Sequence, residues 1–201
     1  MRTVKRESVK LNKGKFEALE EIARAFADDK QAHLDFYQDG LNFSTAKSYR
    51  VRRNELKSSD HHALTPLSVH ASDLAVKEAF ETEVKYWAAI AADIYPRIGS
   101  RAWTDEQKHY AFWLLYDEHR FCCLILDKAP INEKIGLTLA QRKQVQNYLR
   151  RRARRMMGAR PGVKTARSFV LDSTLYSVFQ TATAQGISIS SLEKASASVF
   201  R

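Results

Sequence analysis

Hydrophobic residues recur at three- and four-residue steps through most of the chain, a spacing that predicts amphipathic helices. The pattern predicts a first helix from Asn12 to Gly40 and a shorter, basic helix over 44–57. A long third helix is expected to start at Thr65, because threonine followed by proline is typical of a helix N-terminus. Its apolar face continues to Tyr95, where the following proline should end the helix.

Two further helices are indicated by side chains that can cap them. The sequence TDEQ at 104–107 has the form of a capping box, and its helix is predicted to run to about Asp127. Thr138 is predicted to cap another helix, which ends near Gly158. The inward face of this last helix should be the apolar stripe Val145, Leu149, Ala153 and Met156.

The pattern changes after Pro161 and Gly162. The segments RSFVLDS, TLYSVFQ and GISISSL are short and rich in β-branched and aromatic residues, which predicts strands. Residues 3–11 give a weaker strand signal. The expected fold is therefore mainly α with a small β-unit, an α+β class. Both chain ends, 1–11 and 167–201, would form the β-unit, and 12–166 would form an inserted helical domain.

Positive charge is concentrated in one segment. The chain has 33 basic and 23 acidic residues, for a net charge of +10. Ten of the basic residues and none of the acidic ones lie between Arg142 and Arg167, so the rest of the chain is balanced. A solvated helix surface usually mixes signs, and a block of one sign predicts a polyanionic partner. Nucleic acid is the first expectation and an anionic membrane surface the second.

A second basic segment is the helix expected over 44–57, in which only Glu55 opposes the cations. Tyr49 lies among these cations, where it either stacks on a base or belongs to the core. Arginine favours two-pronged contact with phosphate. The residues predicted to bind nucleic acid are Lys47, Tyr49, Arg50, Arg52, Arg53, Arg142, Lys143, Arg150, Arg151, Arg154, Arg155, Arg160, Lys164 and Arg167.

Acidic residues and histidines come together at three places, and none completes a metal-binding pattern. Glu106 and His109 have the spacing of one half of a two-metal bundle site, without a second half. Asp60-His61-His62 lies in a predicted linker. Asp117-Glu118-His119 lies on an otherwise aromatic and aliphatic helix, where it should face an arginine or solvent. We therefore expect no catalytic residue, no metal and no cofactor.

The sequence shows no membrane or secretory signal. No apolar run approaches the ~20 residues that span a bilayer, and the N-terminal MRTVKRESVK lacks the apolar stretch of a signal peptide. The adjacent Cys122 and Cys123 fit neither a disulfide framework nor a zinc site. A cytoplasmic protein without membrane contact is expected.

Four segments carry a family resemblance. VKLNKGKFEALEEIARAFADDKQAHLDFY looks like an opening strand and first helix, and WAAIAADIYPRI looks like the second half of recognition helices. NYLRRRARRMMGARPGVKTARSFVLDSTLYSV is similar to a basic helix, a proline and a first return strand. GISISSLEK is similar to a strand that ends in a short turn. Together they resemble the N-terminal half of transposon-encoded RNA-guided nucleases of the TnpB/OrfB type and the related type V CRISPR effectors.

The resemblance implies a β-barrel-like wedge with an inserted helical recognition lobe that grips guide RNA and target duplex. The family's nuclease half, with its acidic metal ligands, has no counterpart in these 201 residues. The expected function is non-catalytic binding of RNA, DNA or both, derived from or acting with an RNA-guided nuclease on a separate chain. Two alternatives stay open. One is a sequence-specific DNA-binding regulator that uses helix 138–157, and the other is a stand-alone helical metal-dependent hydrolase that uses Glu106, His109 and Asp117.

Overall fold

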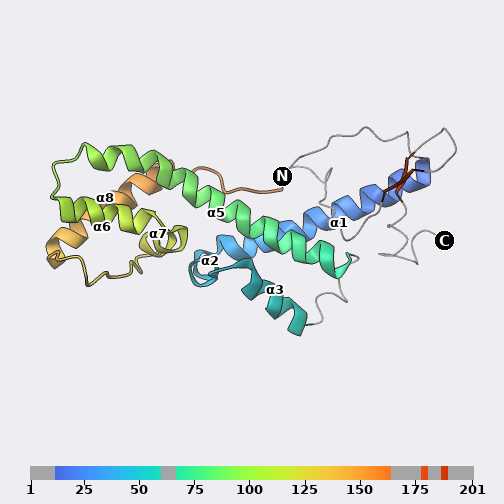
Figure 1. Ribbon diagram of the computed structural model, residues 1–201, viewed down its shortest axis with the longest axis horizontal. Coiled ribbons are helices and arrows are strands. Elements are labelled where there is room, and N and C mark those ends of the chain that lie inside the picture. The colour runs from blue at the N-terminus through green and yellow to red at the C-terminus, as the bar shows by residue number, and fades with distance from the viewer. Residues whose placement is uncertain (1–11, 60–66, 164–177, 181–186, 190–201) are drawn as a thin grey trace. The chain divides into compact units, whose positions relative to one another are not determined.

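Helices make up most of the described chain (Figure 1). The computed structural model describes residues 12–59, 67–163, 178–180 and 187–189. The elements in chain order are the helices α1 (Lys13–Gln38), α2 (Gly40–Thr45), α3 (Tyr49–Ser58), α5 (Val69–Gly99), α6 (Asp105–Leu115), α7 (Glu118–Ile125) and α8 (Leu139–Met156), and the strands β1 (Val178–Gln180) and β2 (Ile187–Ile189).

The strands β1 and β2 form one antiparallel pair, with Phe179 opposite Ser188. They lie within two of the predicted strands, TLYSVFQ and GISISSL, whereas the predicted strands at 3–11 and RSFVLDS lie outside the described residues. The prediction of an α+β fold with a β-barrel-like wedge is wrong, because the described residues are helical apart from this short pair. Barrel closure requires several matched strands, and short alternating segments do not specify such partners.

Backbone contacts divide the chain into two units. Unit 1 comprises residues 1–30, 56–75 and 163–201. Unit 2 comprises residues 31–55 and 76–162. Helices α1, α3 and α5 contribute to both units because the division falls within them. The segments predicted to form a β-unit, 1–11 and 167–201, lie mostly outside the described residues, and that domain boundary stays a prediction.

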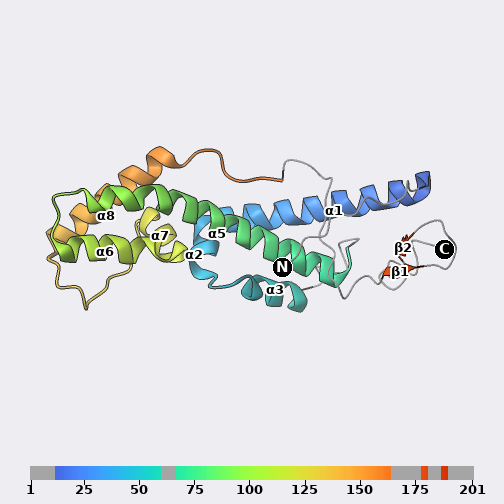
Figure 2. The same cartoon turned by 45° about the horizontal axis from the view of Figure 1, so that its top comes forward.

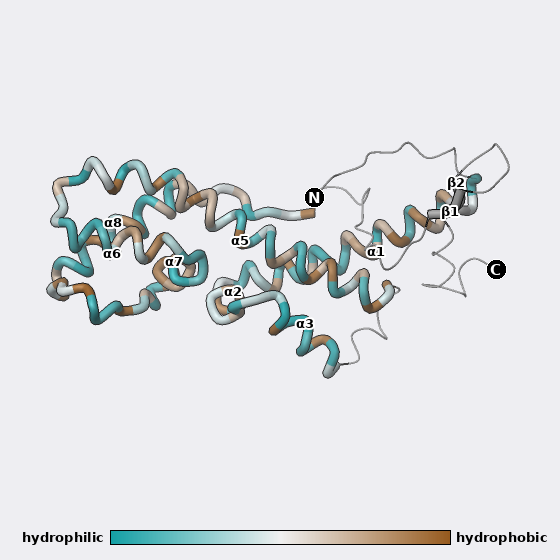
Figure 3. Tube along the Cα trace, in the orientation of Figure 1, coloured by the Kyte–Doolittle hydropathy of each residue, from teal (hydrophilic) through white to brown (hydrophobic). Residues whose placement is uncertain are grey.

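In unit 1, α1 packs on residues in and just before α5. Phe26, Leu67 and Ala75 form a buried cluster, consistent with the alternation of hydrophobic and hydrophilic residues along α1 (Figure 3). Beside it, the buried Asp29 carboxylate accepts a hydrogen bond from the Ser72 hydroxyl at 2.8 Å. This bond offsets part of the cost of removing the carboxylate from water.

Unit 2 has an aromatic core. Figures 1 and 2 show α6, α7 and α8 next to the C-terminal half of α5. Trp87 of α5 packs edge-on against Phe121 of α7, with ring centroids 5.6 Å apart. Tyr37 at the end of α1 and Phe43 of α2 both contact the Phe80 ring. Residues far apart in sequence are thereby held in one packed body.

Several helix boundaries differ from those predicted. Helix α5 continues through Pro96 to Gly99, and the fully buried Ile98 in its last turn offsets the hydrogen bond that proline cannot donate. The single helix predicted over 104–127 is two helices, α6 and α7. Asp117 begins the second, because its side chain accepts a hydrogen bond from the backbone N–H of Arg120 at 2.9 Å.

The helix predicted over 44–57 is also interrupted, since α2 ends at Thr45 and α3 begins at Tyr49. Gly40, predicted to end the first helix, instead begins α2. A Cβ atom on this glycine would lie 3.2 Å from the side chain of Leu126 and 3.5 Å from the sulfur of Cys122. Glycine therefore allows α2 to lie close against α7 and the residue that follows it.

Candidate nucleic-acid interface

Helix α8 carries most of the basic segment and begins with the predicted capping box. Thr138 Oγ1 accepts the N–H of Gln141 at 3.3 Å, and Gln141 Oε1 accepts the N–H of Thr138 at 2.9 Å. The predicted apolar stripe is confirmed, with Val145, Leu149 and Ala153 fully buried and Met156 partly buried. The stripe is narrow, so most of the circumference of α8 is left to polar and basic residues, as its mostly hydrophilic colour in Figure 3 shows.

Side-chain hydrogen bonds set the rotation of α8 about its axis. Gln107 of α6 donates to Gln144 at 2.9 Å, and Gln146 donates to the hydroxyl of Tyr110 at 2.8 Å. These two amides flank the buried Val145, and both bond to α6, so they hold this face of α8 against α6. The arginines in the second half of the helix are thereby presented in a defined direction.

A hollow of about 590 Å³ lies among the end of α5, the turn that follows it, and α8. We call it the arginine groove. No acidic side chain lines it, and arginines outnumber all its other lining residues together. Its lining residues are Arg97, Ser100, Arg101, Ala102, Tyr148, Arg151, Arg152 and Arg155.

The turn after α5 fixes the position of Arg101. The backbone N–H of Arg101 donates to the carbonyl of Ile98 at 3.2 Å, and its own carbonyl accepts the N–H of Trp103 at 2.8 Å. The guanidinium group lies over the Tyr148 ring, 4.1 Å from its centroid, and 4.9 Å from the centroid of Trp103. Arg101 is therefore attached to both walls of the groove, α8 and the turn.

One carboxylate partly offsets the charge of the arginine groove. Asp93 of α5 lies 3.5 Å from Arg97 and 3.9 Å from Arg152. Arg151 and Arg155 are exposed, and neither has an ion-pair partner among the residues that the structure describes. The groove therefore keeps an excess of positive charge.

A second hollow, of about 470 Å³, adjoins the same arginines and is lined by Asp127, Asn147, Arg150, Arg151, Arg154 and Arg155. We call it the Asp127 hollow. Asp127 has a left-handed backbone, with φ at 61°, and its carboxylate lies 2.9 Å from Arg150 and 3.8 Å from Arg154. Arg151 and Arg155 line both hollows. The charge of the second hollow is thus partly neutralised from within.

Arg150, predicted to contact phosphate, is largely occupied within the fold. Its side chain is 15% exposed, and its Nε donates to the carbonyl of Leu124 at the end of α7 at 2.8 Å. Arg150 therefore joins α8 to α7. Most of its side chain is therefore covered by the protein, and phosphate contact by Arg150 stays a prediction.

Arg160, also predicted to bind nucleic acid, forms a buried ion pair. Its Nη1 lies 2.6 Å from Oε1 of Glu83, whose side chain is 1% exposed. The same oxygen accepts the indole N–H of Trp87 at 2.9 Å, and the Arg160 guanidinium stacks over the rings of Tyr86 and Trp87. Burial raises the pKa of Glu83, while the charge of Arg160 lowers it. This arginine holds the segment after α8 against α5.

The remaining cations predicted around α8 differ in their surroundings. Arg142 is partly buried and donates to the carbonyl of Ile135 at 3.2 Å, whereas Lys143 is exposed. Lys164 and Arg167 lie outside the described residues. None of the described cations in this group lines the arginine groove.

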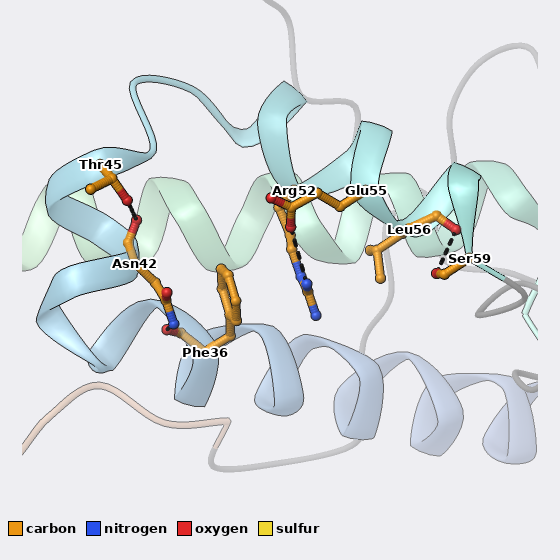
Figure 4. A network of polar contacts seen from close by, with 7 residues as sticks. All are labelled: Phe36, Asn42, Thr45, Arg52, Glu55, Leu56 and Ser59. Carbon is orange, nitrogen blue, oxygen red and sulfur yellow. Dashed lines mark hydrogen bonds and ion pairs between the residues drawn. The ribbon is translucent and has the colours of Figure 1, made fainter.

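The basic residues on and before α3 lie away from the arginine groove. Figure 4 shows Arg52 beside the Phe36 ring and directed at Glu55. Its guanidinium carbon is 4.0 Å from the ring centroid, and its Nη1 is 3.2 Å from the Glu55 carboxylate. Arg52 is therefore engaged within unit 2. Of the others, Lys47 and Arg50 are exposed, and Tyr49 and Arg53 are partly buried.

The acidic residues and histidines form no metal site in the described part of the chain. Glu106 and His109 are exposed at the start of α6. Hydrogen bonds from the backbone N–H of Glu106 and from Thr104 lower the pKa of the Glu106 carboxyl. Asp117 acts as the cap of α7. Asp60-His61-His62 lies outside the described residues.

His119 and Cys122 have structural surroundings. His119 Nδ1 lies 2.8 Å from the carbonyl oxygen of Phe43, and its ring stacks on the rings of Phe43 and Phe80. Burial raises the pKa of the Cys122 thiol to about 12. Because the thiolate is the reactive form, Cys122 is a poor nucleophile at neutral pH.

Three arginines of the groove were missing from the residues predicted to bind nucleic acid: Arg97, Arg101 and Arg152. Arg152 belongs to the basic segment, so its charge was a usable signal. Arg97 and Arg101 lie in YPRIGSRAW, where two separated arginines between Asp93 and Asp105 form no basic run that would mark them. They join the site because the end of α5 packs beside α8.

Within residues 12–59 and 67–163, no helix combines the length and the hydrophobicity that crossing a membrane requires. No family model, curated protein or solved structure matches the chain.

Proposed function

We propose that this protein binds the phosphate backbone of nucleic acid in the arginine groove and is not itself an enzyme. The observation that carries the proposal is the convergence of five arginines, from 97–101 and 151–155, on one hollow that no acidic residue lines. Like charges held this close repel one another, and a bound polyanion removes that cost. A guanidinium fork also matches two oxygens of one phosphate.

The exposure and the bonding of the individual arginines support a ligand that binds from solvent. Arg151 and Arg155 are exposed and line both hollows. Neither is used to hold helices together, in contrast to Arg150 and Arg160, whose groups are bonded inside the fold. A phosphate chain that follows the exposed side of α8 would meet these two arginines first.

The proposal rests on the groove and not on the family resemblance. The β-barrel-like wedge that the resemblance implied is not found in the described residues. Association with a nuclease-bearing chain stays a prediction. The compartment that we propose is the cytoplasm, where free thiols such as Cys122 and Cys123 are kept reduced.

A charge-matched pair of variants tests the proposal. Arg151→Gln with Arg155→Gln removes two groove cations, while glutamine keeps a similar helix propensity. The matched control, Lys85→Gln with Lys134→Gln, removes two exposed cations that line neither hollow. Fluorescence anisotropy with labelled single-stranded RNA and DNA should show at least a tenfold loss for the first variant, about 1.4 kcal/mol. The control should lose about twofold or less.

Two outcomes of this assay would refute the proposed function. Equal losses in the groove variant and the lysine control would show that only net charge matters. Tight binding to phosphatidylserine vesicles without binding to RNA or DNA would identify a membrane surface as the partner. For nucleic acid, three to five phosphate contacts predict that log K falls against log salt with a slope of about −2 to −4.

A further inference from the structure

We propose that Arg101, supported by Tyr148 and Trp103, is a stacking platform for an unpaired base, so that the arginine groove selects single-stranded nucleic acid over duplex. The inference rests on the proposed function, because it concerns the ligand of the same groove. It adds a residue role and a ligand class that phosphate contact alone does not provide.

The platform consists of the Arg101 guanidinium beside two aromatic rings that meet edge to face. The ring of Tyr148 packs edge-on against Trp103, with centroids 5.1 Å apart and planes at 86°. The Arg101 guanidinium covers the Tyr148 ring at 4.1 Å from its centroid. A guanidinium that rests on an aromatic ring leaves its other face available, and such planes stack on nucleic-acid bases. Arg101 is exposed and lines the groove, so this face can be reached from solvent.

The platform is held in place before any ligand binds. The backbone N–H and carbonyl of Arg101 are both hydrogen-bonded within the turn, to Ile98 and Trp103. Trp103 is 8% exposed and anchors the turn in the core. A backbone fixed in this way loses little conformational freedom on binding, which favours affinity.

The surroundings supply the phosphate contacts that a base on this platform requires. Arg97, Arg151, Arg152 and Arg155 line the same hollow, whose volume of about 590 Å³ lies within the range of pockets that hold small ligands. A base paired inside a duplex offers only its edges in the grooves, whereas an unpaired base exposes its face. The combination of a stacking plane with flanking guanidinium groups therefore fits a single strand.

The test separates base contact from phosphate contact. Arg101→Lys keeps the charge and removes the planar group. Its binding is compared with that of the parent for three probes: a 12-nucleotide single-stranded DNA, the same sequence as a duplex, and inorganic polyphosphate, which has no bases. We expect the parent to prefer the single strand to the duplex. The variant should lose about fivefold or more for the single strand and about twofold or less for polyphosphate, because lysine keeps the charge and loses only the two-pronged contact.

A second measurement keeps the inference testable if the variant is poorly folded. With 2-aminopurine in the single strand, binding of the parent protein should change the probe's fluorescence, as stacking does. Equal affinity of the parent for single strand and duplex would overturn the inference, and so would a parallel loss for polyphosphate in Arg101→Lys. If the parent bound none of the three probes, the proposed function itself would be wrong, and the inference with it.

Discussion

Replacing Arg160 by methionine is expected to destabilise unit 2 by about 3 kcal/mol at neutral pH. The change removes the only cation that contacts the Glu83 carboxylate among the described residues, at 2.6 Å. Removal of one partner of a buried ion pair costs about 3–5 kcal/mol. We take the lower end because the Arg160 side chain is 29% exposed and the hydrogen bond from Trp87 to Glu83 remains. Methionine keeps part of the packing on the aromatic rings.

The pH dependence of this effect has a definite sign. Burial raises the folded-state pKa of Glu83 above its ordinary value of 4.5, and Arg160 opposes that rise. A raised pKa contributes stability that is present below the ordinary pKa and is lost as pH increases through the folded-state pKa. Without Arg160 the folded-state pKa rises further. The variant should therefore be closer to the parent in stability at pH 5 than at pH 7.5.

Urea and thermal unfolding followed by circular dichroism measure the effect. A loss of about 3 kcal/mol should lower the melting temperature by about 6–12 °C for a chain of this size. Adding Glu83→Gln to Arg160→Met should recover part of the loss, because no buried charge is then left unpaired. The matched control Arg151→Met replaces an exposed arginine and should stay within about 0.5 kcal/mol of the parent. If Arg160→Met matched the parent in stability and instead lost nucleic-acid affinity, Arg160 would be a phosphate contact after all.

The other predictions concern α8 and the residues before it. Arg150→Gln should destabilise by about 1.5 kcal/mol, since the charge-assisted bond to the Leu124 carbonyl is lost, and its affinity for single strands should change less than that of the groove variants. Asp127→Asn should tighten nucleic-acid binding by about two- to fivefold in anisotropy, because it removes the internal anion beside the exposed Arg154. Asparagine also tolerates the left-handed backbone, and weaker binding would refute this role. Thr138→Ala should lower the unfolding free energy by about 1 kcal/mol through loss of the capping box, and an unchanged urea midpoint would show that the cap contributes nothing.

The helices and their caps follow from local sequence. Thr104 and Thr138 each lie three residues before a glutamine, and both form the expected capping boxes. The narrow stripe of α8 is buried as its spacing predicted. Such features depend on residues within one or two turns of one another, so their pattern can be recognised without the fold. The same locality explains the error at Pro96, where burial of Ile98 in the core accompanies a helix that continues. The break before Asp117 is marked by a local cap, which the prediction of one helix over 104–127 missed.

The charge pattern indicated where cations are dense along the chain. It did not indicate which of these cations can contact a ligand and which are bonded within the fold. Glu83 occupies a position in the buried row of α5 between Phe80 and Trp87, and a carboxylate on an apolar row is a signal that some cation must reach it. The sequence does not say that the cation is Arg160, 77 residues away. The β-barrel prediction failed for a related reason, since the sequence of a strand-like segment does not show which other strands it pairs with.

Sequence alone therefore determined that the protein is largely helical and that its excess charge lies between Arg142 and Arg167. Tertiary structure alone decided that Arg150 and Arg160 are bonded within the fold, and that Arg97 and Arg101 join Arg151 at one groove. The physical reason is the separation along the chain of the residues that interact. Helix periodicity and capping arise from neighbours along the chain, whereas the environment of a long, charged side chain depends on which helices pack beside it.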